Sequence, residues 1–111
     1  MKNGVRIVAG TDCLGSVCEE IVLLNEVGGL TPIEAIKAAT IYAAELMDMD
    51  DEIGTIEVGK LADFIVIDGN PLKGLHILED HVRFISLDGK LYDTKWFDEL
   101  IPHCSYWAPG F

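Results

Sequence analysis

The side chain best placed to do chemistry is Asp12, which follows the stretch Arg6-Ile7-Val8-Ala9-Gly10-Thr11. Residues 5–9 are almost continuously apolar, which predicts a short strand covered on both faces. Barrel enzymes present their catalytic groups at the carboxyl ends of such strands. Asp12 is therefore a candidate acid or base, although an Asp after a strand is also a common turn or capping residue.

The histidines offer a weaker signal. His76 and His81 are five residues apart, a spacing that suits neither a metal pair on a helix nor one face of a strand. His103 and Cys104 are adjacent near the C-terminus, which is a poor arrangement for a metal site. We expect all of them to be solvated residues rather than ligands.

The remaining reactive side chains match no known catalytic pattern. Cys13 and Cys18 lack the Cys-x-x-Cys spacing of a redox pair, and an inert thiol is the simpler expectation for Cys13. Ser16 does not lie in Gly-x-Ser-x-Gly, so a serine-hydrolase site is not indicated. The acidic run at 48–52 lacks the order of a calcium-binding loop and is expected to be a solvated helix end.

Composition limits the function classes. A net charge of -11 with eight Lys plus Arg argues against a nucleic-acid partner, which needs a basic face. No apolar run reaches the roughly 18 residues of a membrane span. The 111 residues can form one core, but a full (β/α)8 barrel needs about 200 or more. An odd number of three cysteines suits the reducing cytoplasm.

Two helices are predicted after the strand. Ser16 and Glu19 form a capping box that opens the first, which Gly28-Gly29 should end. Its expected apolar stripe consists of Val17, Ile21, Leu24 and Val27. Thr31-Pro32-Ile33-Glu34 opens the second, which is expected to run to about Met47. Its expected inward face consists of Ile33, Ile36, Ala39 or Thr40, Ala43 and Met47.

Short β segments are predicted in the second half. Residues 62–68 form one expected strand, and 84–87 and 90–92 form a hairpin around Asp88-Gly89. Residues 95–101 favour a short helix. Because the strand at 5–9 has no parallel partner in this sequence, its edges should recruit another strand. We therefore expect either a missing N-terminal portion or self-association.

Taken together, these motifs resemble the C-terminal segment of the metal-dependent amidohydrolase superfamily, in its imidazolonepropionase, prolidase and aryl-peptide carboxypeptidase branch. The resemblance covers roughly residues 4 to 93 and depends on the order and spacing of short motifs. These are Gly10-Thr11-Asp12, Gly29-Leu30-Thr31-Pro32-Ile33-Glu34-Ala35-Ile36, Ala38-Ala39-Thr40, Ile53-Gly54-Thr55-Ile56-Glu57-Val58-Gly59-Lys60-Leu61-Ala62-Asp63 and Asp88-Gly89-Lys90.

The resemblance implies a role for Asp12. In the family, Gly-Thr-Asp ends the eighth barrel strand, and its Asp contacts the active-site metal and takes a proton from the attacking water. It implies zinc or another divalent metal, held mainly by a His-x-His pair, a bridging Lys or Glu and two further His. All of these precede the matched region, so the chain alone is not expected to bind the metal. Lys60 and Asp63 receive no site role.

The resulting expectation is a mixed α/β fold comprising a partial TIM-barrel end followed by a small β-sandwich portion. Residues 1–50 would hold the last strand and the helices, 51–93 the sandwich strands, and 94–111 a C-terminal extension. The expected function is hydrolysis of a C–N bond in a small amide or dipeptide, with Asp12 as catalytic residue and metal ligand and the fragment inactive alone. The alternatives are a non-catalytic, self-associating relic and a subunit of a split enzyme.

Overall fold

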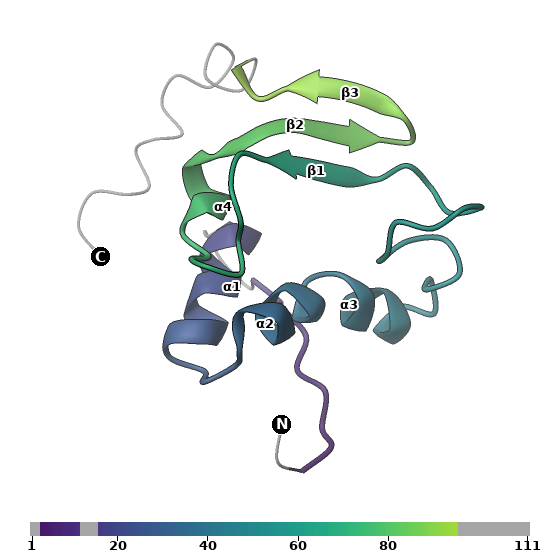
Figure 1. The fold of residues 1–111 in the computed structure, drawn as a ribbon. Coiled ribbons are helices and arrows are strands. Elements are labelled where there is room, and N and C mark those ends of the chain that lie inside the picture. Colours follow the sequence, from purple (N-terminus) through teal and green to yellow (C-terminus); the bar gives the residue numbers. More distant parts are fainter. Residues whose placement is uncertain (1–2, 12–15, 96–111) are drawn as a thin grey trace.

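The structure is a computed structural model that describes residues 3–11 and 16–95 (Figure 1). It is a mixed α/β arrangement of helices followed by a small sheet, which agrees with the coarse fold class expected from the sequence. The elements in chain order are α1 (Val17–Glu26), α2 (Pro32–Ala38), α3 (Ile41–Leu46), β1 (Phe64–Ile67), α4 (Ile77–Asp80), β2 (Val82–Leu87) and β3 (Lys90–Asp93).

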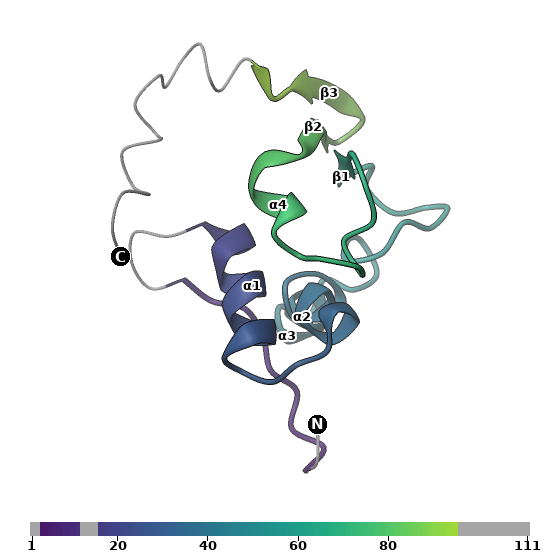
Figure 2. The same ribbon diagram turned by 60° about the vertical axis from the view of Figure 1, so that its left-hand side comes forward.

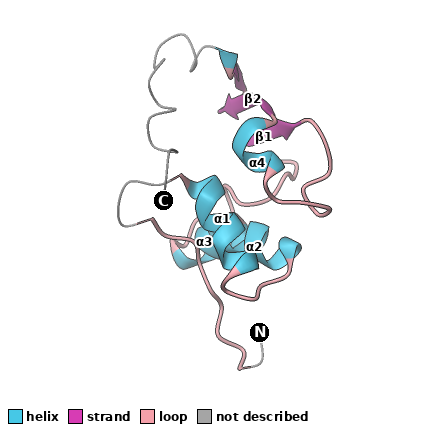
Figure 3. Ribbon diagram, turned by 90° about the vertical axis from the view of Figure 1, so that its left-hand side faces the viewer, coloured by secondary structure: helices cyan, strands magenta, loops and turns pink. Residues whose placement is uncertain are grey.

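Residues 5–9 do not form the predicted strand. In Figure 3 they belong to a loop that runs alongside the helices. A strand requires a neighbouring strand for its backbone hydrogen bonds, and the amide of Ala9 instead donates to the carbonyl of Ala38 at 3.0 Å. The apolar run therefore does not pair as the strand that the sequence predicted.

Helix α1 begins where the sequence predicts. The Ser16 side chain accepts from the Glu19 amide, and the Glu19 carboxylate accepts from the Ser16 amide. The predicted apolar stripe is only partly right, because Ile21 is buried while Val17 and Val27 are exposed. Its buried positions are Ile21 and Val22, since the core lies on that side of the helix.

The second predicted helix is interrupted. A capping box of Thr31 and Glu34 opens α2 as expected, but the helix ends at Ala38 and α3 begins at Ile41. Thr40 lies between them with φ -126 and ψ -100, outside the helical region. The predicted inward face is therefore only partly right, because Ile36 and Ala39 pack against the core. The fully buried side chains are instead Ala35, Ala38 and Ala44, while Ile33 and Met47 are exposed.

The sheet contains three antiparallel strands in the order β1-β2-β3. Ile65 pairs with Ile85, and Ile85 pairs in turn with Tyr92. Asp88 and Gly89 both have positive φ, as a two-residue type I′ turn requires, which confirms the predicted hairpin. The predicted helix at 95–101 lies almost entirely outside the described residues.

The core joins the first helices to the segment that connects β1 with β2. Figures 1 and 2 show α4 between the sheet and the helices α1 and α2. The buried apolar cluster consists of Ile21, Val22, Leu30, Ala35, Ala38, Leu75 and Leu78. No helix within the described ranges is long and apolar enough to cross a membrane.

Candidate functional site

Asp12, the predicted catalytic residue, lies outside the described residues, as does Cys13. The segment that leads to it is described up to Thr11. Arg6 forms an ion pair with Glu45 of α3, and its guanidinium carbon lies 5.0 Å from the centre of the Tyr42 ring. These contacts fix the beginning of the segment against α3.

The end of the segment contacts the other two helices. The Ala9 amide donates to the Ala38 carbonyl of α2 at 3.0 Å. The Gly10 amide points to the carboxylate of Glu20 on α1, with 3.5 Å between nitrogen and oxygen. Since Ser16 caps the same helix, both flanks of the stretch that contains Asp12 are tied to the first turns of α1.

The two described histidines lie at the ends of α4. His76 Nε2 lies 2.7 Å from Glu26 Oε1, and its Nδ1 lies 3.6 Å from Glu79 Oε2. The hydrogen bond and charge of Glu26 raise the pKa of His76, with smaller contributions from Glu79. His81 contacts the carboxylate of its neighbour Asp80. Both imidazoles are thus engaged with carboxylates at the surface.

The described residues bring no set of metal-binding side chains together. Within residues 3–11 and 16–95, no group of three or more His, Cys, Asp or Glu side chains could hold a metal ion. A zinc ion usually takes three or four protein ligands. These residues therefore do not fit the metal that the resemblance implies.

Cys18 is a half-buried thiol on α1. Burial raises its pKa, and the charges of Glu79 and Glu19 act in the same direction. The thiolate is the nucleophilic form of cysteine, so these surroundings make Cys18 less reactive than a free thiol.

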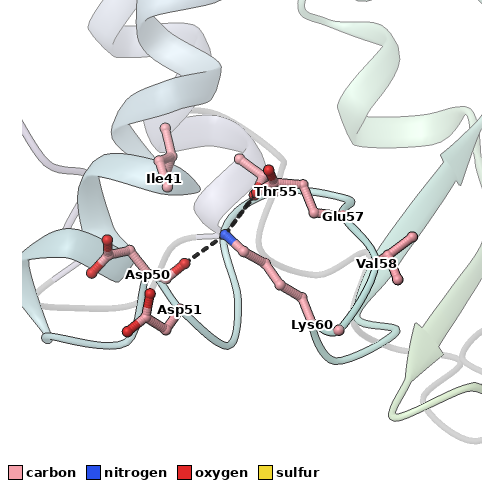
Figure 4. A pocket seen from close by; sticks show the side chains of 8 residues that line it. Ile41, Asp50, Asp51, Thr55, Glu57, Val58 and Lys60 are labelled. Atoms are coloured by element: carbon pink, nitrogen blue, oxygen red, sulfur yellow. Dashed lines mark hydrogen bonds and ion pairs between the residues drawn. The ribbon is translucent and has the colours of Figure 1, made fainter.

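A polar hollow of about 570 Å³ lies between α3 and the loop that leads to β1 (Figure 4). Lys60 crosses it, and its ammonium group donates to the Asp50 carbonyl at 2.5 Å and to Thr55 Oγ1 at 2.7 Å. Glu57 Oε2 lies 3.0 Å from the same nitrogen. All three N–H groups of Lys60 are thereby occupied, so the ammonium holds the loop together.

The rest of this loop is equally well fixed. Hydrogen bonds from Thr55 and Lys60, together with the charge of Lys60, lower the pKa of Glu57. Gly54 has a φ of +93, and a Cβ atom there would lie 2.8 Å from the Cβ of Ala44. Sequence reasoning assigned no role to Lys60, and no local pattern points to a carbonyl ten residues earlier as its partner.

The chain is similar in sequence to proteins of one known family. The model of the Amidohydrolase family matches residues 1–96. The imidazolonepropionase of Alkaliphilus oremlandii is 38% identical over 103 residues, which cover 86% of this chain and 24% of that protein. The ochratoxinase of Aspergillus niger is 35% identical over 97 residues, with 83% and 20% covered.

Solved structures of similar fold point to the same family. The crystal structure of a Xaa-Pro dipeptidase with bound methionine in the active site superposes with a TM-score of 0.75 and 38% identity. The match covers 83% of this chain but 23% of the dipeptidase. The chain thus spans about a quarter or less of the length of the relatives it matches.

Proposed function

Because the chain belongs to the amidohydrolase family, we propose that it is the C-terminal part of a metal-dependent hydrolase that cleaves a C–N bond. The observation that carries the proposal is the TM-score of 0.75 against the dipeptidase, over 83% of this chain. In this proposal residues 1–50 complete a TIM barrel, residues 51–93 contribute to a small β-sandwich, and 94–111 extend it.

The proposed chemistry centres on Asp12. A carboxylate within hydrogen-bond reach of the attacking water can accept its proton and later return it to the leaving nitrogen. The anchors on Arg6, Ala9 and Gly10 support this role, because a general base must be held in place. Any zinc or other divalent metal would need ligands beyond the described residues, and the chain by itself is proposed to be inactive.

The substrate class follows from the relatives. Their printed names include an imidazolonepropionase and a Xaa-Pro dipeptidase. We propose a small amide or dipeptide as substrate. We also propose a cytoplasmic location, because three cysteines cannot all pair in disulfides within one chain and the cytoplasm keeps thiols reduced.

The test measures hydrolysis of a panel of dipeptides and acyl-amino acids with added zinc. The chain is assayed alone and co-expressed with the segment encoded upstream of it. We expect turnover only in the co-expressed form, and a loss of at least about 100-fold in Asp12→Asn. Asp68→Asn is the control, since Asp68 pairs with Arg83 in the sheet. Turnover by Asp12→Asn equal to the unmodified protein would refute the role of Asp12.

A non-catalytic, self-associating protein is the second candidate. It is favoured by exposed apolar side chains, of which Ile56 is 84% and Leu46 73% exposed. Solution mass and metal content separate the two proposals. A metal-free oligomer without turnover in either form supports the second, and a stoichiometric metal in the purified chain contradicts it.

A further inference from the structure

At the interruption between α2 and α3, the hydrogen bonds of Thr40 differ from those of a continuous helix. In a continuous helix the Thr40 amide would donate to the Ile36 carbonyl. Here the Thr40 hydroxyl donates to the Ile36 carbonyl at 2.8 Å, and the Thr40 amide donates to the carbonyl of Lys37 at 3.2 Å. The Ile36 carbonyl also accepts from the Ala39 amide at 3.1 Å. The Thr40 hydroxyl thus shares the acceptor that its own backbone amide would use in a continuous helix, a competition typical of Thr and Ser.

At the same break, the carbonyl of Ala38 has no helical amide as its partner. In a continuous helix the Ala38 carbonyl would accept from the amide of Tyr42. Ala38 is completely buried, so its carbonyl requires a partner within the protein. That partner is the Ala9 amide at 3.0 Å. The break in the helix therefore creates the binding point for the segment that leads to Asp12.

We propose that Thr40 is a positioning residue, whose hydroxyl keeps the helix open so that the Ala38 carbonyl can hold Ala9. The Gly10-Thr11 end of the segment is fixed as a result, and with it the point from which the chain continues to Asp12. The inference rests on the proposed function for its catalytic meaning. The structural part concerns only described residues.

The first test compares Thr40→Val, which keeps the branched shape without the hydroxyl, with Thr40→Ser, which keeps the hydroxyl. Amide hydrogen exchange is followed by NMR in the whole chain. We expect exchange at Ala9 to accelerate at least tenfold in Thr40→Val and to stay as it was in Thr40→Ser. Exchange at Ile21 and Val22 reports on the core and should not change. Equal exchange at Ala9 in all three proteins would overturn the proposal.

A second variant decides the matter if Thr40→Val fails to fold. Replacing the peptide bond before Ala9 by an ester removes the N–H donor of Ala9 and keeps every side chain. Ligation of a synthetic peptide of residues 1–12 to a chain that begins at Cys13 provides this variant and its all-amide control. We expect lower heteronuclear Overhauser values at Gly10 and Thr11 in the ester, as their order decreases. Unchanged values would contradict an anchoring role for Ala9.

The catalytic meaning is tested in the co-expressed assembly. Thr40→Val should lower kcat at least fivefold with KM unchanged, because it displaces the base without touching the substrate, and Thr40→Ser should restore kcat. A change in KM alone would contradict positioning. If the unmodified assembly shows no turnover, the proposed function fails, while the exchange experiment still decides the role of Thr40.

Discussion

His76 Nε2 lies 2.7 Å from Glu26 Oε1, which joins the start of α4 to the end of α1 across 50 residues of sequence. In Figure 2 α4 lies next to the sheet and α1 lies below α4. Since α4 leads directly into β2, this contact helps to hold the sheet against the helices. It also makes that attachment sensitive to pH.

The first prediction concerns this pH dependence. Glu26 raises the pKa of His76 above the ordinary histidine value of about 6.5. The stabilisation from the charged pair is fully present below pH 6.5 and is lost as pH rises through the folded-state pKa. We expect the difference in urea midpoint between the unmodified chain and His76→Gln to shrink over that range. A difference that grows with pH would show the opposite sign of coupling.

The second prediction concerns the cap of α2. The Thr31 hydroxyl accepts from the Glu34 amide at 3.4 Å, while the Thr31 amide donates to Glu34 Oε2 at 2.8 Å. Replacing a threonine cap by alanine costs about 1 kcal/mol. Thr31→Ala should lower the free energy of unfolding by that amount, and Thr31→Ser should not. Chemical denaturation measures both.

The same contact gives a third prediction, on the acid side. Hydrogen bonds from the Thr31 amide and hydroxyl lower the pKa of Glu34. The stabilisation is present above the unfolded value of about 4.3 and is lost as pH falls through the lower folded value. In Thr31→Ala the pKa of Glu34 should rise by part of the shift, because the amide donor remains. Carbon-detected NMR titration of Glu34 measures it, and an unchanged pKa would exclude a contribution from the hydroxyl.

The fourth prediction concerns the loop held by Lys60. Lys60→Met keeps the length of the side chain but leaves the Asp50 carbonyl and Thr55 hydroxyl without their donor. Losing hydrogen bonds to a charged group costs about 1.5–3 kcal/mol. We expect a fall of that order in the free energy of unfolding. Lys73→Met, at an exposed position, is the control and should change it by less than about 0.5 kcal/mol. Equal effects of the two changes would refute the role of Lys60.

The fifth prediction concerns the core. Leu75 and Leu78 are each 4% exposed and pack with Ile21 and Leu30, whereas Leu72 is 50% exposed. Truncation of a buried leucine to alanine typically costs 2–5 kcal/mol. Leu78→Ala should destabilise the chain by about that amount and Leu72→Ala by far less. Thermal unfolding compares them, and similar melting temperatures would show that α4 is not part of the core.

The sequence by itself determined the features whose partners lie close along the chain. Both capping boxes join residues three apart, and the turn at Asp88-Gly89 depends on its own backbone angles. Such signals depend on local geometry, so they specify where α1 and α2 begin and where the hairpin turns. The spacing of apolar residues predicted helices correctly but gave a partly wrong buried face for α1 and for the helix that is divided into α2 and α3. Spacing alone does not determine on which side of a helix the core lies.

Only the tertiary structure decided the contacts between distant residues. Whether residues 5–9 pair as a strand depends on a neighbour, and the neighbour they meet is the Ala38 carbonyl. In our proposal that acceptor is kept available by the Thr40 hydroxyl, which donates to the Ile36 carbonyl. Lys60 and His76 likewise find acceptors 10 and 50 residues away. Long-range hydrogen bonds depend on where folding brings the chain, and no local pattern encodes that position.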